Sequence, residues 1–143
     1  MEQLSDFVAN NMFLVIAFFA VLGLLIANLL SGVGAISVQD AVLKINRENA
    51  VVLDVRNKDV FTQGHVTGAL NFPEKELDKA LKSLNKFQQK KILVFCEMGG
   101  VSSRVVSKLR KHGFTDVSPV KGGLSAWRQE NLPVQSTKEN QSP

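Results

Sequence analysis

The chain has 143 residues, enough for one ordinary domain, and 45% of them are hydrophobic, so a sizeable core is possible. The formal charge of +4 is modest, and the basic residues are scattered rather than interleaved with aromatic residues in a stripe, which argues against nucleic-acid binding. One cysteine and two histidines exclude an intramolecular disulfide framework and a multi-cysteine zinc or iron–sulfur site, and they argue against any metal centre.

An apolar segment follows a short stretch at residues 1–11. No charged residue occurs between Asp6 and Asp40, and Met12–Leu30 is apolar with one interruption at Asn28. As a helix, these 19 residues would extend over about 28 Å, close to the thickness of the hydrocarbon core of a bilayer. We therefore expect a transmembrane helix at residues 12–30.

A cleaved signal peptide is the competing interpretation of this segment. Val33-Gly34-Ala35 offers small residues at the spacing that a signal peptidase prefers. A signal peptide normally begins with basic residues, however, whereas this chain begins with acidic ones, and the apolar run is long for a signal sequence. These features favour a retained anchor.

The orientation of such an anchor follows from the charges on either side of it. Lys44, Arg47, Arg56 and Lys58 follow the segment, and no basic residue precedes it. The positive-inside rule then places the C-terminal part in the cytoplasm. The single thiol agrees with this placement, because the cytosol keeps thiols reduced.

After a flexible joint at residues 31–35, the chain alternates between strand-like and helix-like segments. Runs of β-branched apolar residues predict strands, and apolar residues with a 3.6-residue period predict helices. The expected strands are 51–55, 69–72, 92–95 and 117–120, and the expected helices are a short one after a capping Ser37 and the segments 74–84, 102–112 and 124–130. This alternation predicts an α/β domain at 36–135, with a parallel sheet and helices on both faces. A polar tail at 136–143 is expected to be disordered.

The only cysteine, Cys96, comes directly after the expected strand 92–95 and before a glycine loop and a helix start. Ligands of parallel α/β sheets bind beyond the carboxyl ends of the strands. Successive backbone N–H groups of such a loop can form an anion-binding nest, and the helix N-terminus adds partial positive charge. The position therefore predicts a thiolate nucleophile, with negative charge stabilised on, or attached to, its sulfur.

Cys96 has two other interpretations. A buried cysteine that merely fills space is the commoner fate of a free cysteine. A tyrosine-phosphatase-type site also places cysteine before an anion-binding loop, but it needs an arginine six positions later to grip phosphate, and that position is Ser102. Arg104 comes two residues too late, so the loop is sized for a sulfur atom.

Three stretches together resemble the rhodanese family of single-domain sulfurtransferases. The first runs from Leu53-Asp54-Val55-Arg56 through Phe61, Gly64-His65-Val66 and Gly68-Ala69 to Pro73; the second is Cys96 with Gly99 and Ser102; the third is Gly122-Gly123-Leu124 with Ala126-Trp127 and Leu132-Pro133-Val134. The likeness covers about residues 36–134. Single-pass rhodanese-like proteins of bacterial inner membranes share the layout with an N-terminal anchor.

This resemblance implies a double-displacement reaction without a cofactor or metal. Cys96 would take sulfane sulfur from a small donor or a persulfide-bearing protein, hold it as a persulfide, and pass it to a thiol or protein acceptor. Backbone N–H groups of the loop would bind the persulfide. The implied binding residues are Glu97, Met98, Gly99, Gly100, Val101, Ser102 and Ser103.

Two loop positions depart from the family pattern, which often has basic residues there. They are Glu97 and Val101. A carboxylate beside Cys96 is expected to disfavour the thiolate and to repel an anionic donor such as thiosulfate. We therefore expect weak activity with thiosulfate.

The other matching residues are expected to be structural. Asp54 and Arg56 would form local hydrogen bonds or an ion pair, His65 would order the turn before the second strand, and Trp127 would pack in the core. Arg104 would either lie on a solvated helix face or help to receive an anion.

Two functions from different classes follow from these observations. The first is a membrane-anchored sulfurtransferase in the bacterial inner membrane, with its domain in the cytoplasm and the bilayer as a partner. The second is a non-catalytic docking module for another membrane protein, for which Gly23 and Ala27 offer a small-residue pair that could seat a neighbouring helix. The position of Cys96 favours the enzyme.

Overall fold

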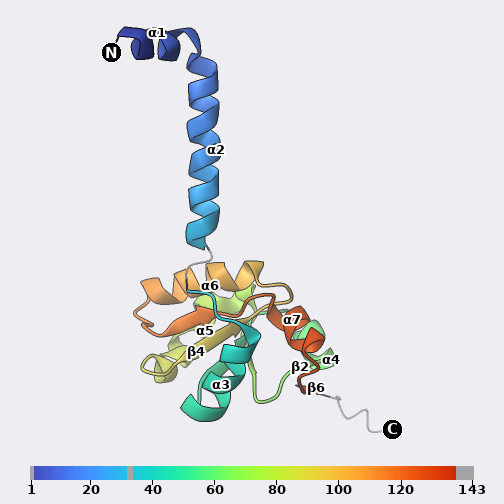
Figure 1. Cartoon of the computed structure of the whole chain (residues 1–143). Helices are drawn as coiled ribbons and strands as arrows, with labels where there is room; N and C mark the ends of the chain where they lie inside the picture. Colours follow the sequence, from blue (N-terminus) through green and yellow to red (C-terminus); the bar gives the residue numbers. More distant parts are fainter. Residues whose placement is uncertain (1, 32–33, 138–143) are drawn as a thin grey trace. The chain divides into compact units, whose positions relative to one another are not determined.

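The computed structural model describes residues 2–31 and 34–137, and the chain divides into two compact units, Met1–Val33 and Gly34–Pro143. The expected tail falls outside the described residues from 138 onwards. Figure 1 labels the elements in sequence colours.

The first unit consists of two helices, α1 (Glu2–Asn10) and α2 (Met12–Ser31). They meet at Asn11, whose side-chain amide donates a 2.9 Å hydrogen bond to the Phe7 carbonyl oxygen. Among the described residues, we found no helix with the length and apolarity that crossing a membrane requires. The predicted transmembrane helix is therefore not confirmed, and the side chains of its last residues, 28–30, lie outside the described ones.

A four-stranded parallel sheet forms the centre of the second unit, as predicted. Its order is β3-β1-β4-β5, and every neighbouring pair is parallel. The strands are β1 (Val51–Asp54), β3 (Leu70–Asn71), β4 (Ile92–Phe95) and β5 (Val117–Pro119). Ile36 adds a parallel bridge to Val120 at one edge. The central strand β4 is buried along its whole length, in agreement with its continuous apolar sequence.

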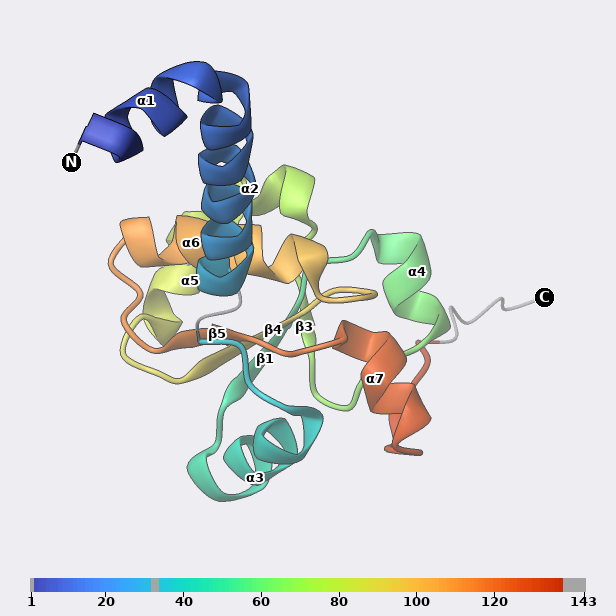
Figure 2. The ribbon, with the colours of Figure 1, turned by 45° about the horizontal axis from the view of Figure 1, so that its top comes forward.

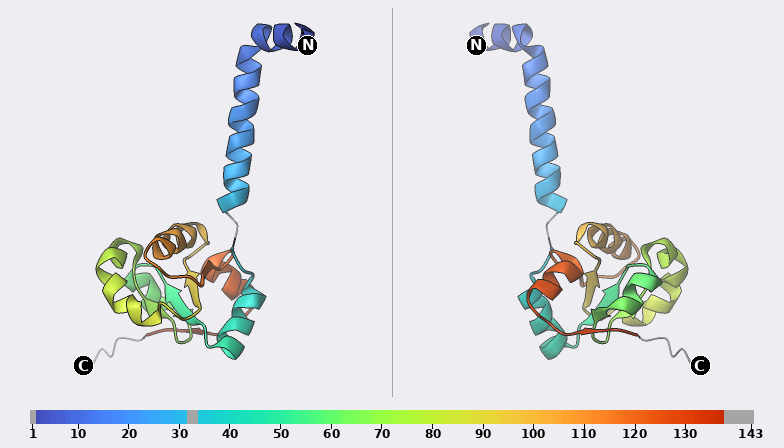
Figure 3. Two further views of the ribbon diagram at one scale, coloured as in Figure 1. Left: turned by 90° about the vertical axis from the view of Figure 1, so that its left-hand side faces the viewer. Right: turned by 90° about the vertical axis from the view of Figure 1, so that its right-hand side faces the viewer.

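Helices cover both faces of this sheet, again as predicted. Side chains of a strand alternate between the two faces, so each strand feeds two cores. One core joins Leu53, Ile92, Val94 and Cys96 to α5 (Leu77–Leu84) and α6 (Gly100–Lys111); the other joins Val52, Leu93 and Phe95 to α3 (Val38–Glu48) and α7 (Gly123–Gln129). Figure 2 shows α5 and α6 on one side of the sheet and α3 on the other, and Figure 3 shows α7 on the side of α3.

Several short elements were not predicted. They are α4 (Lys58–Gln63), the antiparallel pair β2 (His65–Val66) and β6 (Val134–Gln135), and the 3₁₀ turns η1 (Glu74–Glu76) and η2 (Asn85–Phe87). These segments have two to six residues, too few for a hydrophobic period to be read. The predicted helix 74–84 begins as the turn η1 and continues as α5.

Local sequence signals correctly predicted two of the helix boundaries. Ser37 caps α3 as expected, since its hydroxyl oxygen accepts a 3.1 Å hydrogen bond from the Asp40 N–H. Gly113 follows α6 with a φ of +90°, which suits glycine and ends the helix. The start of α6 was predicted two residues late, at Ser102 instead of Gly100.

Candidate active site

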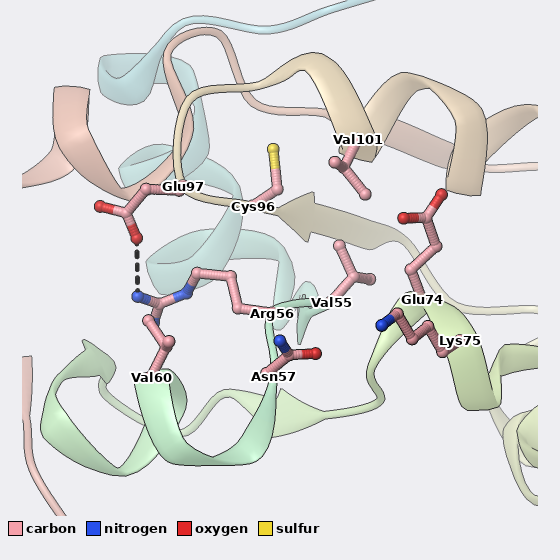
Figure 4. A pocket seen from close by; sticks show the side chains of 9 residues that line it. All are labelled: Val55, Arg56, Asn57, Val60, Glu74, Lys75, Cys96, Glu97 and Val101. Carbon is pink, nitrogen blue, oxygen red and sulfur yellow. Dashed lines mark hydrogen bonds and ion pairs between the residues drawn. The ribbon is translucent and has the colours of Figure 1, made fainter.

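Cys96 lies directly after β4, where the sheet meets a surface cavity of about 370 Å³. The residue is 3% exposed and belongs to the core beneath α5 and α6. Figure 4 shows its thiol beside the side chains that line the cavity. The lining residues are Val55, Arg56, Asn57, Val60, Glu74, Lys75, Cys96, Glu97 and Val101. Cys96 is thus a core residue at an open site.

The loop after Cys96 returns a backbone donor to the sulfur. The Gly99 N–H donates a hydrogen bond of 2.8 Å to Sγ. Gly99 has a φ of +98°, and a Cβ there would lie 3.2 Å from the Gly122 nitrogen, so the position suits glycine on two counts. A backbone donor at this place suits a sulfur that carries negative charge.

Ser102 holds this loop without contacting the sulfur. Its buried hydroxyl donates a 2.8 Å hydrogen bond to the Gly99 carbonyl oxygen, which fixes the peptide that follows the sulfur's donor. Because α6 begins at Gly100, Ser102 lies in the first turn of that helix. The partial positive charge of the helix N-terminus therefore begins closer to Cys96 than predicted.

The start of α7 supports the loop from the other side. The N–H groups of Leu124 and Ser125 donate to the carbonyl oxygens of Cys96 and Glu97, at 2.8 and 3.0 Å. In a trans peptide the N–H points opposite to the carbonyl, so the N–H groups of Glu97 and Met98 point away from α7. These contacts hold the loop open as a nest of donors.

Gly123 makes this close approach possible. Its φ is +53°, and a Cβ there would overlap the backbone of Cys96 and Glu97. The sequence indicated Gly122-Gly123 as a turn before the last helix and as part of the resemblance, and the structure adds a further reason for glycine, which is that α7 contacts the loop through backbone atoms.

Arg56 anchors the opposite wall of the cavity. Its Nε and Nη2 donate to the buried Asp54 carboxylate at 2.7 to 3.1 Å, and Nη2 also donates to the Gly64 carbonyl oxygen at 2.7 Å. Burial lowers the pKa of Arg56, but the hydrogen bonds and charges of Asp54 and Glu97 outweigh burial and raise it. The predicted local ion pair is confirmed.

Glu97 directs its carboxylate toward Arg56 and away from the sulfur (Figure 4). One carboxylate oxygen accepts from Arg56 Nη1 at 3.0 Å, and the other accepts from Arg128 Nη1 at 3.4 Å. By sequence alone, Glu97 is an uncompensated carboxylate beside Cys96. Its two partners, 41 and 31 residues away along the chain, offset that charge.

The other predicted loop residues contribute unequally. Val101 lines the cavity, Met98 is exposed at 77%, and Gly100 starts α6. The Ser103 carbonyl oxygen accepts a hydrogen bond from the Ser107 hydroxyl within α6. Sequence reasoning missed the far wall of the cavity, which contains Val55, Asn57, Val60, Glu74 and Lys75. Its signal would have been the ends of two neighbouring parallel strands, because Val55, Asn57 and Val60 follow β1 whereas Glu74 and Lys75 follow β3.

His65 and Trp127, both expected to be structural, are placed in that way, and Arg104 lies on a solvated helix face. His65 Nδ1 lies 2.8 Å from the Phe61 carbonyl oxygen, and its ring stacks on that of Phe61. Trp127 packs in the core and donates from Nε1 to the Pro133 carbonyl oxygen at 3.0 Å. Arg104 is exposed and pairs with Glu74 at 3.2 Å. Among the described residues, no group of three or more His, Cys, Asp or Glu side chains could hold a metal ion.

Comparisons with known proteins agree with this architecture. Residues 37–130 match the model of the rhodanese-like domain. The chain is 32% identical to the uncharacterized protein YibN of Escherichia coli, over 94% of this chain and 97% of YibN. It is 36% identical to the chloroplastic thiosulfate sulfurtransferase 16 of Arabidopsis thaliana, over 59% of this chain and 78% of that protein. The rhodanese-like domain of the Anabaena protein Alr3790 superposes with a TM-score of 0.66 at 29% identity, over 77% of this chain and 84% of that structure.

Proposed function

Because the chain belongs to the rhodanese-like domain family, we propose that it is a sulfurtransferase that carries sulfane sulfur as a persulfide on Cys96. The observation that carries the proposal is the 2.8 Å hydrogen bond from the Gly99 N–H to Sγ, beside an open cavity. A cysteine that only filled space would need neither a backbone donor nor access to a cavity. The likeness to a thiosulfate sulfurtransferase supports the same class of reaction.

The reaction has two balanced half-steps. First, the Cys96 thiolate attacks the outer sulfur of a donor R–S–SH; a new S–S bond forms on Cys96, the donor S–S bond breaks, and its electron pair leaves with RS⁻. Second, an acceptor thiolate attacks the outer sulfur of the Cys96 persulfide and regenerates the Cys96 thiolate. Each half-step exchanges one S–S bond for another, so no oxidant is needed.

We propose that the donor is a small persulfide or a persulfide-bearing protein. The acceptor is a thiol or a protein. We expect weak turnover with thiosulfate. The cavity offers three valines, Val55, Val60 and Val101, beside its polar groups. This lining suits a donor with an apolar carrier and little charge.

Mass spectrometry of the full chain tests this proposal. After incubation with cysteine persulfide, the peptide that contains Cys96 should gain one sulfur atom, and the gain should disappear after addition of an acceptor thiol. Cys96→Ser is the control, and because the chain has one cysteine no other thiol can contribute. Absence of persulfide with every donor, together with a membrane-protein partner captured equally by Cys96→Ser, would reverse the conclusion in favour of the docking role.

We further propose that the first unit anchors the chain in the bacterial inner membrane as a single-pass helix at 12–30, with the second unit in the cytoplasm. Large apolar side chains of α2 are exposed, including Phe13, Leu24 and Leu25, and such a surface needs an apolar surrounding. In carbonate-washed membranes the chain should stay in the pellet, and a protease added outside spheroplasts should leave the second unit intact. Release by carbonate would contradict the anchor.

A further inference from the structure

Two guanidinium groups converge on a single carboxylate beside Cys96. Arg56 follows β1, Arg128 belongs to α7, and Glu97 is the residue after the cysteine. Each Glu97 oxygen accepts from a different arginine, so the carboxylate bridges two separate elements. This arrangement occupies cationic donors close to the residue that an anionic sulfur donor would approach.

The position of Arg56 makes its occupied donor important. Asp54 and the Gly64 carbonyl oxygen take its Nε and Nη2 donors, and Nη1 faces Glu97. Arg56 also lines the cavity that Cys96 adjoins. If Glu97 did not accept from Nη1, that donor would be available to an anion in the cavity.

The charges of the cavity lining balance. Arg56 and Lys75 are basic, and Glu74 and Glu97 are acidic, which gives two charges of each sign. Because Asp54 already pairs with the Arg56 guanidinium and Glu97 adds a second carboxylate to it, the cavity offers no net attraction to a dianion such as thiosulfate.

We propose that Glu97 is a specificity-determining residue that caps Arg56 and Arg128 and thereby selects low-charge sulfur donors over dianionic ones. This inference rests on the proposed function, since it names the substrate class of the same site. The cause differs from direct repulsion of the donor by Glu97: the carboxylate, which Arg128 also contacts, withholds the Arg56 Nη1 donor that would otherwise be available to an anion in the cavity.

Alkylation of Cys96 tests the capping without requiring sulfur transfer. The measured quantity is the rate constant with iodoacetate, an anion, divided by that with iodoacetamide, its neutral analogue. In full-length Glu97→Gln this ratio should rise about fivefold, because one carboxylate charge is removed beside two guanidinium groups. Sulfate, an unreactive dianion, should also protect Cys96 from iodoacetamide at a lower concentration than in the unmodified chain.

Two further variants separate capping from general charge. Glu130→Gln removes the same charge just after α7, away from the cavity lining, and should leave the ratio within about 1.5-fold of the unmodified chain, as expected for a remote exposed charge. Glu97→Gln combined with Arg128→Gln should give back part of the increase. An unchanged ratio in Glu97→Gln, or an equal rise in Glu130→Gln, would overturn the proposal.

The same variants distinguish this inference from the proposed function. If Cys96 accepts sulfur from cysteine persulfide and Glu97→Gln leaves the alkylation ratio unchanged, the enzyme stands and the capping fails. If no donor forms a persulfide while the ratio rises, the capping stands and the sulfurtransferase fails. With both correct, the Michaelis constant for thiosulfate should fall about fivefold in Glu97→Gln relative to that for cysteine persulfide.

Discussion

The residues around Cys96 fall into a buried and an exposed layer. The buried layer, the site floor, consists of Asp54, Arg56, Ser102 and Gly123. The exposed layer, the site rim, consists of Glu97, Met98 and Arg128. Both layers contain an acidic residue that contacts an arginine. The Asp54 carboxylate is 1% exposed and its ion pair with Arg56 is 2.7 Å long, whereas the Glu97 carboxylate is 47% exposed. The same pair of residue types therefore occurs in two very different dielectric surroundings.

This difference in exposure separates the residues that stabilise the site from those that determine its selectivity. A buried ion pair cannot lose one partner without leaving a charge in a medium that solvates it poorly. An exposed pair that loses a partner is solvated by water instead. We therefore expect substitutions in the site floor to destabilise the domain and substitutions in the site rim to change its selectivity. Four variants test this contrast.

Gly123→Ala should have the largest effect, a loss of about 4 kcal/mol in the free energy of unfolding. The added Cβ would overlap the backbone of Cys96, and a φ of +53° is strained for alanine. Urea unfolding of the full chain, followed by the fluorescence of Trp127, measures it; this single tryptophan is buried in the second unit and reports on that unit.

Gly100→Ala is the matched control for this variant. A Cβ at Gly100 meets no atom within 4 Å, and the residue begins α6, where alanine is well tolerated. Its free energy of unfolding should stay within about 0.5 kcal/mol of the unmodified value or rise slightly. Equal losses of unfolding free energy in Gly123→Ala and Gly100→Ala would contradict the expected difference between the site floor and exposed positions of the loop.

Asp54→Asn should come second, at about 3 kcal/mol. The amide keeps the shape of the carboxylate but leaves the guanidinium of Arg56, a residue only 7% exposed, without its buried counter-charge. The same fluorescence-detected urea titration measures the loss. A change below about 1 kcal/mol would mean that Glu97 alone can compensate Arg56, and the two layers would then not differ.

Much of the fold could be predicted from the sequence because its signals are local. Ile92–Phe95 is a continuous apolar run, and Ser37 stands three residues before Asp40, so a strand and a helix cap were both predicted where they occur. The two-residue strands β2 and β6 were missed, because they are defined by pairing with each other across the chain and not by a pattern within either.

The site shows the same limit. The pair of Asp54 with Arg56 was predicted because the two residues are two positions apart at a strand end. The pairing of Glu97 with Arg56 and Arg128 was not, because it depends on how β1 and α7 meet the loop in space. The surroundings of Glu97 therefore could not be read from its sequence neighbours alone.

Ser102→Ala should cost about 1 kcal/mol, the usual value for one buried hydrogen bond. The lost bond is the 2.8 Å contact from the Ser102 hydroxyl to the Gly99 carbonyl oxygen. That contact holds Gly99, whose N–H donates a hydrogen bond to the Cys96 sulfur. The rate of persulfide formation should therefore also fall, by roughly tenfold. Ser107→Ala, which removes an exposed hydroxyl of the same helix, is the control and should change neither quantity appreciably.

Glu97→Gln should have the smallest effect on stability, below about 1 kcal/mol, although it removes a partner of the same arginine as Asp54→Asn does. Water replaces the lost charge at Glu97, while nothing replaces it at Asp54. The two single variants and their double variant form a thermodynamic cycle, measured by urea unfolding. Because both carboxylates contact one guanidinium, we expect the losses to be non-additive by about 0.5 kcal/mol or more. Full additivity would show that Arg56 does not couple the floor to the rim, and the rim would then tune the site through Arg128 alone.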